Sequence, residues 1–131
     1  MATTNLANDP IQVDTSLDSI TIRRDIAGLT GGASLDVTGF APTTIKAGHV
    51  VIKETATGHY KPMPVNGDAY AALPANHTIE GVVRASVPTS RAMVGVMYNG
   101  EVNEATSPYP VTTEIKTALS LIKFTKDERK G

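Results

Sequence analysis

The chain has 131 residues, 40% of them hydrophobic, and a formal net charge of −1 at pH 7. This length is enough for one domain with its own core, and no apolar run approaches the roughly 20 residues of a membrane span. The near-neutral charge gives no overall attraction to nucleic acid or to an anionic membrane, and the lack of cysteine excludes disulfides and thiolate metal ligands.

The first residues of the chain are polar and contain only isolated apolar positions. Ile11, Val13 and Leu17 do not build a periodic face, and an Asn-Asp-Pro triplet interrupts any helix. Ordering a chain costs about 1–2 kcal/mol per residue, so a segment this polar would not stay ordered alone. Residues 1–19 are therefore predicted to be an extended N-terminal arm, and residues 20–131 the folded domain.

Residues 20–44 are predicted to add a hairpin to this domain. Ile20, Ile22 and Ile26 alternate with polar residues, which is typical of a half-buried strand. The glycine-rich stretch GLTGGAS then breaks the pattern, and LDVTGF has the composition of a returning strand.

Three further strands and one ordered loop are expected in the middle of the chain. The first strand covers residues 48–54 and turns at Thr57-Gly58, and the others lie in IEGVVRASV and RAMVGVMY. Residues 61–78 are rich in turn formers, and Asn66-Gly67-Asp68 predicts a left-handed turn with a short element in DAYAAL after it.

The stretch RAMVGVMYNGEV raises a choice between a carboxylate site and a tight turn. Its apolar residues occupy both faces, which predicts a strand buried on both sides, and Asn99-Gly100 predicts a type I′ hairpin turn. Glu101 and Glu104 would point to opposite faces of a continuing strand. They do not make the convergent carboxylate pair that glycoside hydrolysis needs.

Helical periodicity is confined to the C-terminal part of the chain. Ile115, Leu119 and Ile122 recur at helical spacing, and Thr112 can cap, so a helix is predicted over residues 112–122. The fold class is therefore mainly β: a small antiparallel β-barrel or β-tulip-like domain with one C-terminal α-helix and an extended N-terminal arm.

The side chains that could carry chemistry do not form a recognisable constellation. His49, His59 and His77 lack metal-ligand spacing, and neither a nucleophile elbow nor a phosphate-binding loop is present. We expect no enzymatic activity, no catalytic residue, no metal and no cofactor. The basic residues lack the interleaved aromatics of a single-strand nucleic-acid platform.

The order of the elements resembles the lambda-type head decoration proteins of tailed bacteriophages over residues 45–124. That family typically shows an A-G-x-V/L strand, a G-x-Y/F-x-P turn, a G-x-V/L strand, a G-E-V-N segment and a short C-terminal helix. Residues 47–50 read AGHV, 58–62 read GHYKP, 81–83 read GVV and 100–103 read GEVN. The chain departs from the family where a glycine-led final strand often follows the helix, since its sequence there is IKFTKDERKG.

The resemblance implies a structural protein of the virion. Such proteins bind the outer surface of the expanded capsid and cement neighbouring subunits of the major capsid protein, commonly as homotrimers at three-fold and quasi-three-fold positions. Direct contact with nucleic acid or membrane is not expected. The expected capsid-binding residues lie in the arm and at its junction with the domain: Ile11, Val13, Leu17, Ile20 and Ile22.

A second hypothesis is a carbohydrate- or cell-surface-binding β-module displayed on a virion. Such a module needs an exposed aromatic platform, for which the sequence offers Tyr60, Tyr70, Tyr98 and Tyr109.

Overall fold

The computed structural model describes residues 18–29, 31–38, 40 and 42–125, and every structural statement below refers to these residues. Three of the expected capsid-binding residues, Ile11, Val13 and Leu17, lie outside them. The elements in chain order are α1 (Asp18–Thr21), β1 (Ile22–Gly28), β2 (Ala33–Ser34), β3 (Thr44–Ile45), β4 (Val50–Glu54), β5 (Tyr60–Pro62), β6 (Val65–Asn66), β7 (Ala69–Tyr70), β8 (His77–Val83), β9 (Val87–Pro88), η1 (Thr89–Arg91), β10 (Met93–Val94), β11 (Val96–Asn103), η2 (Glu104–Thr106), α2 (Thr113–Ala118) and β12 (Ile122–Thr125).

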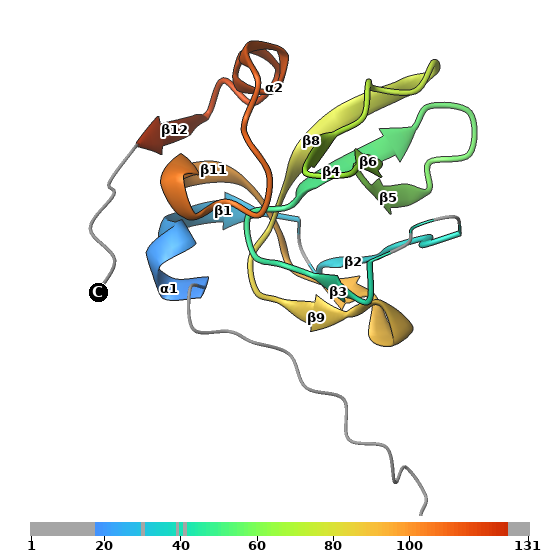
Figure 1. Cartoon of the computed structure of the whole chain (residues 1–131), viewed down its shortest axis with the longest axis horizontal. Helices are drawn as coiled ribbons and strands as arrows, with labels where there is room; N and C mark the ends of the chain where they lie inside the picture. Colours follow the sequence, from blue (N-terminus) through green and yellow to red (C-terminus); the bar gives the residue numbers. More distant parts are fainter. Residues whose placement is uncertain (1–17, 30, 39, 41, 126–131) are drawn as a thin grey trace, which may run out of the picture.

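One sheet organises the domain (Figure 1). Its strands follow the order β1-β11-β8-β4-β5 with antiparallel neighbours, and β12 joins β11 in parallel. Short two-stranded ladders connect β10 with β2, β3 with β9, and β6 with β7. The predicted mainly β character is confirmed. The path from β1 to β5 stays open among the described residues, so of the expected β-barrel or β-tulip-like arrangements a closed barrel is not formed.

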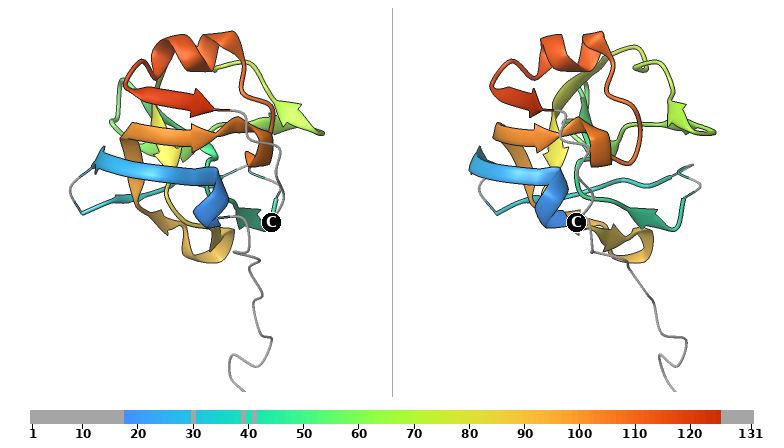
Figure 2. Two further views of the ribbon diagram at one scale, coloured as in Figure 1. Left: turned by 90° about the vertical axis from the view of Figure 1, so that its left-hand side faces the viewer. Right: turned by 60° about the vertical axis from the view of Figure 1, so that its left-hand side comes forward.

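The central strands of the sheet, β4, β8 and β11, are buried on both faces. Neighbouring residues of one strand point to opposite sides, so Val82 packs in one hydrophobic cluster and Val83 in the other. α2 lies over the first face and β12 extends the sheet beside β11, whereas β2, β3 and β9 lie toward the other face (Figure 2). Val96 and Met97 on β11 divide in the same way and are both 0% exposed, which confirms the predicted two-sided burial for β11. Met93, predicted to lie on the same buried face as Met97, lies on the separate strand β10 and is 75% exposed.

Two of the predicted turns are present. The β4–β5 hairpin turns at Thr57-Gly58, where Gly58 has a positive φ of 77°. The β6–β7 hairpin has only Gly67 and Asp68 between its paired strands, and Gly67 has a φ of 67°. A positive φ at the first of two turn residues is the geometry of a type II′ turn.

The predicted turn at Asn99-Gly100 is wrong. Both residues lie in the middle of β11, where Gly100 faces Asp25 of β1 on one side and Ile122 of β12 on the other. A Cβ at Gly100 would collide with the carbonyl oxygen of Arg24, so the glycine serves the close approach of two strands.

The hairpin expected over residues 20–44 is not formed either. Instead of pairing with each other, the two segments pair with strands distant in sequence: β1 with β11 and β2 with β10. Ile20 lies in the single turn of α1, half-buried, and Ile22 packs against the core of the first sheet face. The predicted alternation of buried and exposed residues along β1 does not extend to Ile26, which is 60% exposed.

The C-terminal helix begins as predicted but ends early. The Thr112 hydroxyl accepts a hydrogen bond from the Ile115 amide at 3.3 Å, and α2 ends at Ala118 rather than at residue 122. Ile122 instead starts β12, whose parallel pairing with β11 keeps this side chain in the core.

Candidate functional site

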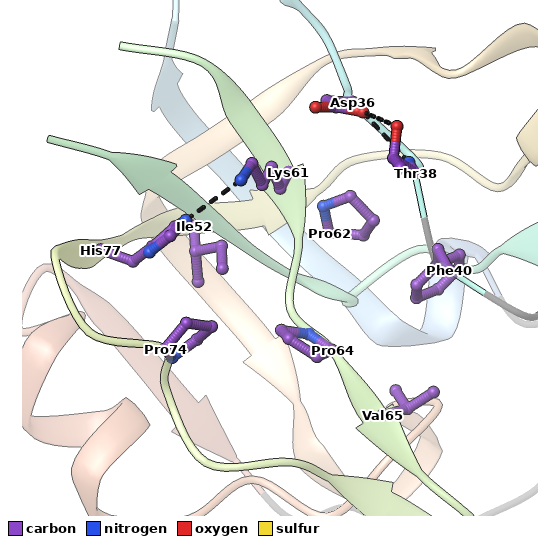
Figure 3. A pocket seen from close by; sticks show the side chains of 10 residues that line it. All are labelled: Asp36, Thr38, Phe40, Ile52, Lys61, Pro62, Pro64, Val65, Pro74 and His77. Atoms are coloured by element: carbon purple, nitrogen blue, oxygen red, sulfur yellow. Dashed lines mark hydrogen bonds between the residues drawn. The ribbon is translucent and has the colours of Figure 1, made fainter. Parts of the chain in front are cut away.

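A hollow of about 280 Å³ lies where the β2–β3 segment meets β4, β5, β6 and the start of β8 (Figure 3). Its floor is apolar and contains three prolines, and its rim is polar. Ile52, Pro62, Pro64, Val65, Pro74 and Phe40 form the apolar part, and Asp36, Thr38, Lys61 and His77 form the polar part. We refer to it below as the proline pocket.

One side of the rim is a linked group of polar side chains. The Lys61 ammonium lies 3.2 Å from the Glu54 carboxylate and 3.3 Å from His77 Nε2. His77 Nδ1 donates to the Ala75 carbonyl at 2.8 Å, so Nε2 is the acceptor for Lys61. The pKa of Glu54 is lowered, mainly by the hydrogen bond from Lys61 and next by the positive charge of Lys61.

The other polar side of the rim is held by a local turn (Figure 3). The Asp36 carboxylate accepts hydrogen bonds from the Thr38 hydroxyl at 2.7 Å and from its amide at 3.1 Å. These two bonds are the main reason why the pKa of Asp36 is lowered. Asp36 at the rim and Glu54 next to Lys61 are therefore both ionised at pH 7 and already hydrogen-bonded.

Behind Phe40 lies a cluster of rings around His49. The rings of Phe40, Tyr70 and Tyr109 meet the imidazole edge-on, with centroids 5.2–5.6 Å away. His49 is 1% exposed, and its Nε2 donates to the Met63 carbonyl at 2.9 Å. Burial lowers the pKa of His49 to about 4, so the ring is neutral at pH 7.

The polar groups at the proline pocket make their contacts with one another. The part of the chain that the structure describes contains no group of three or more carboxylates and histidines able to hold a metal ion. At the proline pocket Lys61 pairs with Glu54, and Asp36 accepts a hydrogen bond from the Thr38 hydroxyl. The arrangement suits a bound ring with one apolar face and a hydrogen-bonding edge.

A second cluster fixes the point where the N-terminal segment enters the domain. The Asp18 carboxylate accepts hydrogen bonds from the Ser86 amide at 2.9 Å and from its hydroxyl at 2.7 Å. The Ser86 hydroxyl in turn accepts one from the Ala47 amide at 3.0 Å. The buried Thr21 hydroxyl lies 2.9 Å from the hydroxyl of Thr106. We call these contacts of α1 the arm root.

The resemblance motif AGHV takes part in the arm root. Gly48 has a φ of 90°, and a Cβ there would lie 2.6 Å from the Thr21 methyl group. Only a glycine allows this backbone and this close approach. Asp18, Thr21 and Ser86 are not among the residues predicted from the sequence, in which an acidic residue at the start of a short helical turn is the one local signal.

The strand next to the arm root has a protected edge. β1 stands at the end of the sheet, and within the described ranges its strand partner is β11 alone. Its pairing is interrupted by register shifts, and it carries Arg23, Arg24 and Asp25 in succession. Bulges and charges are the features that discourage a further strand from adding to an edge.

The four tyrosines do not form the platform that a carbohydrate module needs. The Tyr70 hydroxyl accepts a hydrogen bond from the Val50 amide, and its ring packs on Tyr109. Lys53 lies over the ring of Tyr60, and Tyr98 is 38% exposed on β11.

Comparisons with protein-family models, with curated proteins and with solved structures gave no match. Within the described residues, none of the helices has the length and apolar character required to cross a membrane.

Proposed function

We propose that this protein is a non-enzymatic capsid decoration protein with a β-tulip-like domain. In this role it binds the outer surface of the expanded phage head and cements neighbouring subunits of the major capsid protein. The observation that carries the proposal is the arm root. It ties the start of the domain to the β8–β9 turn and to the β3–β4 loop. The preceding residues therefore leave the domain from a defined point.

The positions of the resemblance motifs support this proposal. AGHV leads into β4, GHYKP closes the β4–β5 hairpin and GVV ends β8, so the three motifs meet in neighbouring strands. The fourth motif, GEVN, completes β11 between β1 and β12. Segments far apart in sequence thus form one continuous framework.

The protected edge of β1 favours attachment through the arm itself. Because β1 is charged and bulged, strand addition to the folded domain is disfavoured there. Residues 1–17 carry Ile11, Val13 and Leu17, which can pair with a sheet edge of a partner instead. Burial of a large apolar side chain stabilises such a complex by about 1.5–3 kcal/mol.

The proposal is tested by deleting residues 2–17 and keeping Asp18. The melting temperature should stay nearly unchanged because the arm root is intact, whereas cosedimentation with expanded empty shells should be lost. Unexpanded shells serve as the comparison for the full chain, which should not bind them. Undiminished binding of the shortened chain to expanded shells would show that attachment lies elsewhere.

The proline pocket favours a second candidate, a module that binds a sugar or another small ring at a cell surface. Its apolar floor and hydrogen-bonding rim match such a ligand, although Phe40 replaces the expected tyrosines. A Val65→Trp substitution would fill the pocket. It should abolish binding to a glycan array and leave shell binding intact if this second function exists.

A further inference from the structure

The chain contains two Asn-Gly pairs, and the fold gives them opposite environments. Asn66-Gly67 forms the exposed tip of the β6–β7 hairpin, whereas Asn99-Gly100 lies within the paired strand β11. Asn-Gly is the dipeptide in which the following backbone nitrogen reaches the asparagine side chain most easily, because glycine has no Cβ to obstruct it.

At the hairpin tip the nucleophile and its target are both accessible. Asn66 and Gly67 are exposed, and an atom built at the Cβ position of Gly67 would meet nothing within 4 Å. The β6–β7 ladder contains two residue pairs, so its tip opens at little cost.

In β11 the corresponding nitrogen is already engaged. The Gly100 amide donates to the Leu121 carbonyl at 3.3 Å, and Asn99 pairs with Ala27 of β1. The strand is bordered by β1 on one side and by β8 and β12 on the other. Attack at Asn99 therefore requires local opening of the central sheet.

We propose that Asn66 is a site of spontaneous deamidation in the native protein and that β11 protects Asn99. The Gly67 amide gives its proton to solvent, and its nitrogen attacks Cγ of Asn66. The bond from Cγ to Nδ2 breaks, and ammonia leaves after taking up a proton from water. Water then opens the resulting succinimide at one of its two carbonyls, which yields an aspartate or an isoaspartate at position 66.

The isoaspartate product changes the wall of the proline pocket. It adds a methylene group to the main chain at the residue that pairs with Ala69, which shifts the register of the two-pair β6–β7 ladder. Val65 lines the pocket, and the new carboxylate lies two positions from Asp68. The modification therefore adds negative charge and loosens the hairpin on that side.

The experiment follows both sites in the same full-length chain. The protein is incubated in mildly alkaline buffer, and peptide mass mapping over time measures the replacement of NH₂ by OH at positions 66 and 99. In the native state position 66 should react at least about tenfold faster, since modification of Asn99 depends on the population in which β11 is open. In denaturant the two sites should react at comparable rates.

An Asn66→Gln variant is the matched control, because the longer side chain disfavours the same five-membered ring. It should abolish the product at position 66 and leave the native rate at Asn99 unchanged. Native rates that are equal, or faster at Asn99, would overturn the proposal. The proposal would also be overturned if Asn66 reacted only in denaturant, or if neither Asn66 nor Asn99 reacted in denaturant.

Discussion

At the residue scale, His49 makes the stability of the domain depend on pH. The pKa of His49 is about 4 in the folded protein, and its ordinary value is 6.5. Between these two pH values the imidazole is protonated in the unfolded chain and neutral in the folded chain. The contribution of neutral His49 to the free energy of unfolding is therefore fully present above pH 6.5 and is lost as the pH drops toward 4. The full effect is about 3 kcal/mol at 1.36 kcal/mol per pKa unit.

Urea unfolding at a series of pH values checks this prediction. A His49→Leu variant loses the hydrogen bond to Met63 and should be less stable at neutral pH. Its free energy of unfolding should nevertheless stay flat between pH 6.5 and the range where carboxylates titrate, whereas that of the natural chain should decline. A variant that keeps the wild-type slope would assign the effect to other groups.

At the scale of elements, β12 is expected to be essential although it has four residues. Ile122 is 5% exposed in the core, and Phe124 packs against the same cluster. Removing both costs about 1.5–3 kcal/mol per side chain and leaves the backbone of β11 unpaired on one side. A chain ending at Leu121 should therefore lose at least about 3 kcal/mol of stability or fail to fold.

A chain ending at Thr125 is the matched control, because it differs from the shorter one by β12 alone. Thermal unfolding of the two chains measures the contribution of the strand. Equal melting temperatures would mean that β12 does not stabilise the sheet.

The elements that were predictable from the sequence are those with their own apolar pattern. β4, β8 and β11 are predicted as strands from their apolar runs, and for β11 the apolar residues on both faces also predict burial on both sides. β2, β3, β9 and β10 have two residues each, and their pairing is decided by distant partners rather than by local sequence. The predicted helix extends to Ile122, the first residue of β12, because Leu119 and Ile122 fit helical spacing as well as they fit a turn and a strand.

The candidate site was less predictable than the fold. The proline pocket collects side chains from Asp36 to His77 that share no periodicity, so their proximity follows from topology alone. Asn99-Gly100 satisfied a turn pattern, yet tertiary pairing on both sides of β11 outweighed that local preference.

At the scale of the whole molecule, the homotrimer implied by the resemblance stays a prediction, and Ile26 is the side chain we expect at its interface. It lies on β1 and is 60% exposed, and on the same strand Arg23 pairs with Glu101 at 3.4 Å and Asp25 pairs with Arg84 at 2.8 Å. An exposed apolar side chain on a strand that otherwise carries charged residues is a candidate interface anchor, and closed symmetry would hide it. An Ile26→Asp substitution should convert trimers to monomers in light scattering without lowering the melting temperature.

Leu121→Asp is the control. Leu121 is 59% exposed on the connection between α2 and β12, so this substitution should leave the trimer intact. A monomeric wild-type protein, or equal dissociation by both variants, would contradict an interface on β1.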